Sequence, residues 1–142
     1  MSEEEYNTAL GRILEYCSSR GISVNLNSNA FTYCKEEDAI TCAIKSHNTT
    51  SMIVGLLHEA GHAVNISTAF SNMSNTTKWK YIYTLEQEYL AWQEGWNLAL
   101  TLNIANTSLW KEYQKNWMNS WSKYIQHYSA LYSKSRVGIK QT

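Results

Sequence analysis

The 142-residue chain is 44% hydrophobic and 17% charged, a composition typical of an ordinary globular domain with a sizeable core. Its twelve basic and twelve acidic residues cancel, so nothing in the charge indicates a nucleic-acid-binding protein. The acidic N-terminus lacks the apolar segment of a secretory signal, and no apolar run approaches the ~20 residues of a membrane span. The three cysteines have no paired spacing. We therefore expect one cytoplasmic domain over residues 1–142, with no nucleic-acid or membrane partner.

The N-terminal third of the chain predicts one helix followed by a small sheet. Ser2 and Glu5 have the spacing of a capping box, and apolar residues then recur at helical spacing until Gly21, where we expect the helix to end. Three short segments then have strand character: 22–26, 31–34 and 39–42. The charged residues 35–38 suit a hairpin turn, so we expect a short antiparallel-type β-sheet and an α+β fold.

A motif helix should follow the sheet, beginning at one of several capping residues in 48–51 and ending near Asn65. It contains His58-Glu59-Ala60-Gly61-His62, which spells H-E-x-x-H. Residues four apart lie one helical turn from each other, so both imidazoles can bind one metal ion. Glu59 projects beside them, where a carboxylate can take a proton from an attacking water. Most apolar residues of this helix fall on the side opposite the histidines, which predicts packing on the sheet.

The C-terminal half predicts a polar loop over residues 66–77 and two long helices, at about 78–103 and 108–133. The last helix carries an aromatic stripe at helical spacing, which consists of Trp110, Tyr113, Trp117, Trp121, Tyr124, Tyr128 and Leu131. Such a stripe is most often part of the core. The alternative is a contact surface for a protein partner or for a second copy of the chain.

A zinc site needs at least a third protein ligand, and Glu88 is the strongest candidate. It is the lone carboxylate on a helix face of apolar and small residues, which are Leu85, Ala91, Trp92, Gly95, Ala99 and Leu102. Burying an unpaired carboxylate costs several kcal/mol, so this group needs a cation or strong hydrogen bonds. Pairing with Lys or Arg, or a position at the edge of the core, remains the alternative. His47 and His127 are weaker candidates. His47 is expected in a solvated loop, and His127 is expected beside the aromatic stripe of the last helix.

The H-E-A-G-H sequence at 58–62, followed 26 residues later by Glu88-Tyr89-Leu90-Ala91, resembles the H-E-x-x-H and E-x-x-A motifs of gluzincins. The strands that precede the motif helix and the small size are similar to a minimal ImmA/IrrE-like metallopeptidase. The resemblance implies a small zincin-like domain in which His58, His62 and Glu88 bind Zn²⁺ and Glu59 is the general base. It also implies that the strand around 39–43 is an edge that binds an extended substrate. The chain differs from many gluzincins in one position, because it has Trp92 where they have Asp or Asn. A hydrogen bond to the second nitrogen of a ligand histidine must then come from elsewhere, such as a backbone carbonyl.

The expected function is zinc-dependent hydrolysis of peptide bonds, with a peptide or a specific protein as substrate. Donors to the developing oxyanion could be Tyr81, Tyr83 or His47, although tyrosine is too common here for the sequence to choose among them. The main alternative is a catalytically inactive zincin-like module that binds a protein through its aromatic helix. The other is a structural helical protein with an accidental H-E-x-x-H.

Overall fold

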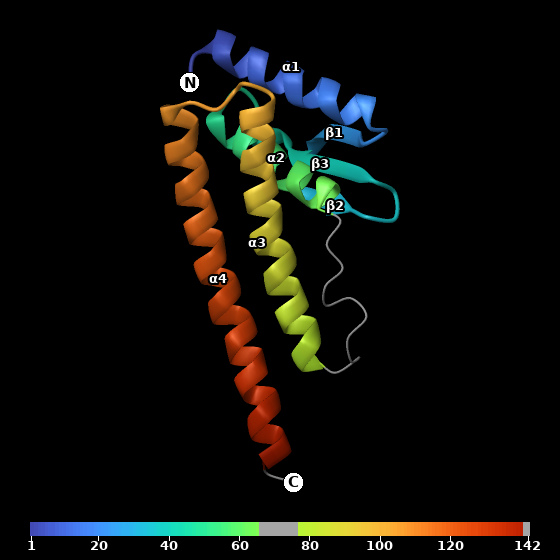
Figure 1. Cartoon of the computed structure of the whole chain (residues 1–142), viewed down its shortest axis with the longest axis vertical. Coiled ribbons are helices and arrows are strands. Elements are labelled where there is room, and N and C mark those ends of the chain that lie inside the picture. The colour runs from blue at the N-terminus through green and yellow to red at the C-terminus, as the bar shows by residue number, and fades with distance from the viewer. Residues whose placement is uncertain (66–76, 141–142) are drawn as a thin grey trace.

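The computed structural model describes residues 1–65 and 77–140, with four long helices and one three-stranded sheet among them (Figure 1). This is the expected α+β class. Helix α1 (Glu3–Ser19) begins at the predicted capping box, in which the Ser2 hydroxyl accepts from the Glu5 amide at 3.1 Å and the Glu5 carboxylate accepts from the Ser2 amide at 3.2 Å. The helix ends just before Gly21, whose φ of 73° is a left-handed conformation that glycine adopts without strain.

The sheet contains β1 (Ser23–Ser28), β2 (Thr32–Cys34) and β3 (Ala39–Ala43) in the order β1-β3-β2. The predicted hairpin of β2 and β3 is confirmed as an antiparallel pair. The prediction of an antiparallel-type sheet is wrong for the other pair of strands, because β1 lies parallel to β3. Alternating burial shows which residues face the core but not the direction of the neighbouring strand, so the sequence pattern could not distinguish these cases.

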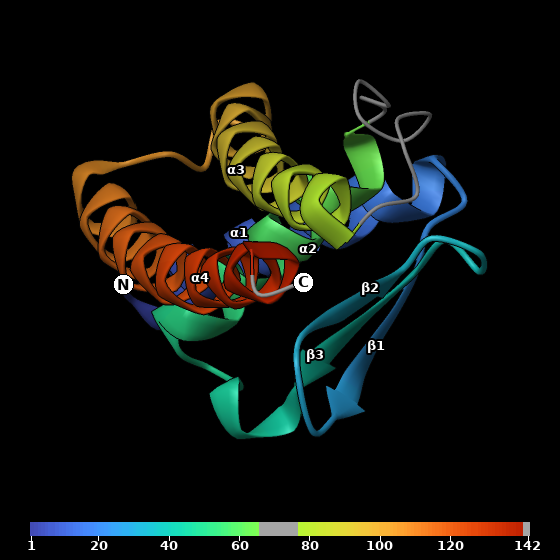
Figure 2. The same ribbon diagram turned by 90° about the horizontal axis from the view of Figure 1, so that it is seen from below.

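Helix α2 (Thr50–Val64) is the motif helix and has the predicted bounds within two residues. It packs against α1, β2 and β3 on one side and against α3 (Thr77–Thr101) on the other, so it lies at the centre of the molecule (Figure 2). Its residues from Met52 to Gly61 are buried, except for half-buried Gly55. The helix therefore does not expose its histidine side to solvent but turns it toward α3.

Helix α4 (Thr107–Lys140) returns antiparallel to α3, and the pair extends away from the sheet (Figure 1). It is seven residues longer at its C-terminus than the sequence predicted. The predicted loop at 66–77 lies outside the described residues, apart from Thr77, which begins α3. No helix in the described ranges is long and apolar enough to cross a membrane.

The first four residues of the aromatic stripe contact α3, but only Tyr113 lies in the core and the rest of the stripe is half-buried, so the core interpretation holds for part of the stripe. Tyr113 is fully buried, and its ring lies 5.1 Å from that of Trp92 and 5.3 Å from that of Trp96. Farther along, Tyr89 of α3 contacts Trp117 and Trp121, each at 5.9 Å between ring centroids. These contacts hold α3 and α4 in register, and α3 is the helix that carries Glu88.

Candidate metal centre

The two histidines of the motif lie one turn apart on α2, with their ring centroids separated by 4.7 Å. His58 is 9% exposed and Glu59 is 6% exposed, so both polar groups are inside the protein. Buried imidazole and carboxylate groups need partners, because an unpaired buried charge costs several kcal/mol. Whether the motif forms a metal site or occurs by chance therefore depends on the residues around this part of α2.

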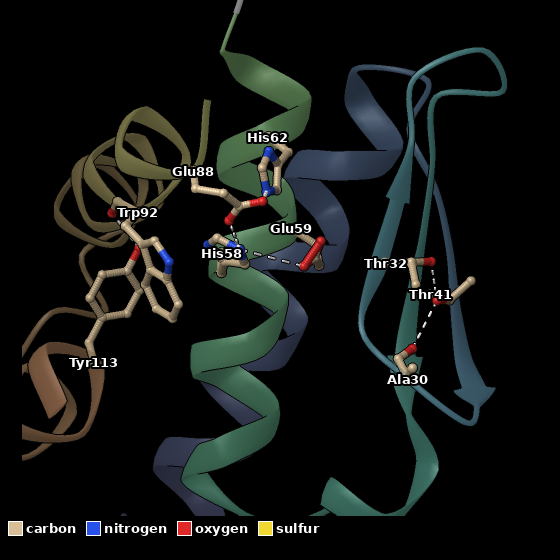
Figure 3. Close-up of polar contacts among 9 residues, drawn as sticks. All are labelled: Ala30, Thr32, Thr41, His58, Glu59, His62, Glu88, Trp92 and Tyr113. Atoms are coloured by element: carbon tan, nitrogen blue, oxygen red, sulfur yellow. Dashed lines mark hydrogen bonds and ion pairs between the residues drawn. The ribbon is translucent and has the colours of Figure 1, made fainter. Parts of the chain in front are cut away.

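Glu88 of α3 faces both histidines, as Figure 3 shows. Its Oε1 atom lies 3.2 Å from Nε2 of His62, and its Oε2 atom lies 3.1 Å from Nε2 of His58. Ligand atoms of all three residues lie within 4.8 Å of one another. The Glu59 carboxylate is beside them, with Oε2 3.9 Å from Nε2 of His58. All four residues that the sequence predicted for the site are thus brought together.

Two glycines allow this meeting, because α2 and α3 cross with their backbones almost in contact. A Cβ atom on Gly61 would overlap the carbonyl oxygen of Ala91 and lie 2.9 Å from the amide nitrogen of Gly95. A Cβ atom on Gly95 would lie 2.5 Å from the carbonyl oxygen of Leu57. Small residues on the Glu88 face of α3 and on the facing side of α2 therefore allow the two helices to approach closely. A larger residue at either position would separate Glu88 from the histidines.

The charges in the site are strongly coupled. Burial alone would raise the pKa of Glu88, but its attraction to His58 and His62 outweighs burial and holds that pKa at about 2. Burial would lower the pKa of His62, but hydrogen bonding and charge from Glu88 raise it overall. The pKa of Glu59 is raised, chiefly by burial and against the opposing effect of the two histidines. Glu88 is therefore the carboxylate that stays ionised, whereas Glu59 is the more basic one.

The donor set suits a zinc ion. Two imidazole nitrogens and one carboxylate oxygen are ligands that Zn²⁺ prefers, at about 2.0–2.2 Å each, which places neighbouring tetrahedral ligands about 3.4 Å apart. Nε2 of His58 lies 3.1 Å from Oε2 of Glu88 and Nε2 of His62 lies 3.2 Å from Oε1, so each imidazole has one carboxylate oxygen at close to that spacing. Oε2 of Glu88 is buried and, although near His58, meets no hydrogen-bond partner with suitable alignment among the described residues. A buried oxygen in this state has a lone pair free for a cation.

The support expected for a ligand histidine, a backbone carbonyl at its second nitrogen, is absent for His58 in the described part of the chain. Its buried Nδ1 atom has no hydrogen-bond partner there. The indole of Trp92 instead stacks on the His58 ring, with centroids 4.1 Å apart and an interplanar angle of 29°. Trp92 is 4% exposed, and its own Nε1 atom has no partner among the same residues.

Tyr124 is a site residue that the sequence did not single out. Its side chain lies close enough to the site to sense the charges there: the pKa of Tyr124 is raised to about 12 by burial and by the negative charges of Glu88 and Glu59. The sequence assigned Tyr124 only to the aromatic stripe, because spacing along α4 does not show which residue of the stripe lies near the carboxylates of the site. The only signal in the sequence was the hydroxyl of Tyr124 on a largely apolar stripe, and two other tyrosines of the stripe share it.

The other candidates lie elsewhere. Nε2 of His47 is 2.8 Å from the carbonyl oxygen of Leu26, and His127 is exposed on α4. Neither belongs to the cluster of possible ligands among the described residues, which contains Glu88 beside the two motif histidines. The side chain of Tyr81 lies outside the described residues, and no contact of half-buried Tyr83 with either histidine is seen in the described part of the chain. The expectation that the strand at 39–43 is a sheet edge is wrong, because β3 is the central strand.

Comparison of the chain with protein-family models, with curated proteins and with solved structures gives no match. The case for a function therefore depends on the residues and geometry of the site.

Proposed function

We propose that this protein is a zinc metallopeptidase with a minimal zincin-like, ImmA/IrrE-like domain, which hydrolyses peptide bonds in a specific protein or peptide. One observation carries the proposal, namely that His58, His62 and Glu88 converge across two helices with Glu59 beside them. A chance H-E-x-x-H sequence would not be expected to have an ionised carboxylate from another helix between its histidines. The raised pKa of Glu59 also suits a group that must accept a proton near neutral pH.

In this mechanism each residue of the site has a separate task. His58, His62 and Glu88 would hold the ion, which when bound supplies Lewis acidity that polarises a carbonyl and lowers the pKa of water toward about 7. Glu59 accepts the proton of the attacking water and then donates it to the leaving amine. Tyr124, whose pKa is raised by the nearby charges of Glu88 and Glu59, is the donor that we assign to the developing oxyanion.

An extended substrate would need a strand edge close to α2, and β2 is the better of the two edges. Of the two outer strands β1 and β2, it is β2 that packs against the motif helix. Its outward backbone groups are available for main-chain hydrogen bonds to a peptide, a common mode of peptide recognition. The substrate strand would then run beside Thr32–Cys34 rather than beside β3.

Zinc binding is the first test of the proposal. Elemental analysis of the purified protein should find about one zinc per chain, and His58→Ala and Glu88→Gln should each remove most of it, since three protein ligands are the minimum for such a site. His127→Ala, at an exposed position, and Glu94→Gln, on the same helix as Glu88, are matched controls that should keep the metal. A parent protein that takes up no zinc even when zinc is supplied would exclude the peptidase.

Hydrolysis is the second test, because zinc alone does not make an enzyme. The zinc-loaded protein should generate new N-termini in a peptide library, and a chelator should stop their appearance. One observation favours the alternative of an inactive module that binds a protein: Met118 and Ile125, two turns apart on α4, are 64% and 39% exposed. Stoichiometric zinc without any cleavage, in libraries and in native protein extracts, would favour that alternative.

Removal of the Tyr124 hydroxyl should slow hydrolysis without removing zinc. We expect Tyr124→Phe to lower kcat about 10²-fold, the effect of losing one donor to an oxyanion, because the half-buried ring is retained. Steady-state kinetics on a cleaved peptide would measure this loss, and Tyr128→Phe, one turn farther along α4, is the matched control. An unchanged kcat would remove Tyr124 from the mechanism.

A further inference from the structure

The His58 ring lies against the face of the Trp92 indole. The ring centroids are 4.1 Å apart, and the planes are inclined by only 29°, so the contact is a stack rather than an edge contact (Figure 3). Trp92 follows Glu88 by one helical turn on α3, which places both side chains on the same face toward α2. One helix thus contacts His58 twice, once through a carboxylate and once through an aromatic face.

This stack takes the role that a hydrogen bond usually has for a metal-binding histidine. Such a histidine almost always donates its second ring N–H to a carboxylate, a carbonyl or water, which fixes the orientation of the ring. Nε2 of His58 faces Glu88, so Nδ1 is the second nitrogen, and it is buried without a partner in the described part of the chain. Rotation of the ring is therefore restricted by packing against Trp92 and not by a hydrogen bond.

Trp92 is itself held firmly in place. Its backbone carbonyl accepts a hydrogen bond from the buried Tyr113 hydroxyl, and its indole contacts the Tyr113 ring edge-on at 5.1 Å. Trp117 also lies nearly parallel to the indole, with ring centroids 6.5 Å apart and an interplanar angle of 7°. The aromatic contacts between α3 and α4 thus extend without interruption to a ligand of the candidate metal centre.

We infer that Trp92 is a positioning residue of the metal centre, whose indole face orients His58 and favours the metal-bound form of its ring. The inference rests on the proposed zinc site. An imidazole that donates its lone pair to a cation becomes electron-poor, and an electron-rich face beside it is then attractive, most strongly for tryptophan. The long aromatic stripe of α4 would accordingly support metal binding as well as the core.

Zinc affinity of Trp92 variants tests this inference, measured by competition with a chelating dye. Loss of a group that orients a ligand typically weakens metal binding 10–100-fold. We expect that loss in Trp92→Met, which fills space without an aromatic face, and a loss several-fold smaller in Trp92→Phe, which keeps one. If Trp92 served packing alone, the two variants would bind zinc equally, and that result would overturn the inference.

Trp96→Met and Trp96→Phe are the matched controls, because Trp96 lies one turn along α3 and its ring contacts those of Trp110 and Tyr113 instead of a histidine. Both should bind zinc as the parent protein does. A parent that binds no zinc would defeat the proposed site itself. A parent that binds zinc through His58, together with a Trp92→Met variant of parental affinity, would defeat only the role of Trp92.

Tryptophan fluorescence gives a second readout that does not depend on the stability of the Met variant. Zinc binding changes the charge of the ring that stacks on Trp92, so titration with zinc alone should change the emission of the parent protein. The change should be lost in Trp92→Phe and retained in Trp96→Phe. A change of the same size in both variants would show that the reporting indole is not the one beside His58 and would overturn the inference.

Discussion

Replacement of Glu59 by Gln should leave zinc binding intact and lower the rate of peptide hydrolysis by about 10²–10⁴-fold, the usual contribution of a general base. The two side chains have nearly the same shape, and the amide cannot accept the proton of the attacking water. Glu59 is 6% exposed and burial already raises its pKa, so a neutral amide suits this position. The fold should therefore be retained, and initial rates together with zinc content would separate chemistry from metal binding.

Glu15→Gln is the control for this change, because Glu15 is exposed on α1, away from α2. It should have parental rates. If Glu59→Gln retained full activity with one bound zinc, Glu59 would not be the base, and another group near the histidines would have to accept the proton. If the variant lost its zinc, Glu59 would instead contribute to the binding of the ion.

Replacement of Gly61 by Ala should destabilise the whole protein by about 3 kcal/mol or more, the upper part of the range for overpacking a rigid site. The added methyl group would overlap the Ala91 carbonyl oxygen, which is a backbone atom and cannot rotate away as a side chain can. Relief requires α2 and α3 to separate, and separation would carry Glu88 away from both histidines. Urea unfolding should show the loss of stability, and zinc affinity should fall with it.

Gly11→Ala adds the same methyl group but should change the stability in the opposite direction. A Cβ atom at Gly11, exposed within α1, would meet nothing within 4 Å. Alanine should there stabilise the helix by about 0.5–1 kcal/mol, since glycine loses more conformational freedom on folding. If Gly61→Ala were as stable as Gly11→Ala, the close crossing of α2 and α3 would be refuted.

Local chemistry made much of the fold predictable. The capping box at Ser2 and the left-handed turn at Gly21 depend on residues within one helical turn, and both are present. The four predicted site residues could be found for a similar reason. His58, Glu59 and His62 are related by helix geometry alone, and Glu88 stood out because a lone carboxylate on an apolar face needs a partner.

The errors and omissions concern contacts between elements that are distant in sequence. The direction of β1 relative to β3 and the central place of β3 depend on how the segment between β1 and β2 crosses the sheet, which side-chain alternation does not encode. The nearness of Tyr124 to Glu88 and Glu59 depends on how α4 packs against α2 and α3. The stack of Trp92 on His58 depends on the rotation of α3 about its axis and on its close approach to α2, which two glycines permit.

The division of the site between two helices also bears on the stability of the protein. His58 and His62 belong to α2 and Glu88 belongs to α3, so an ion held by all three would join the helices in the manner of a cross-link. An unfolded chain does not bring these residues together, and the binding free energy would therefore add to the free energy of unfolding. At a free zinc concentration 100-fold above Kd, that addition is about 2.7 kcal/mol. The supply of metal would then set how much of this small domain is folded, and so how long it survives proteolysis.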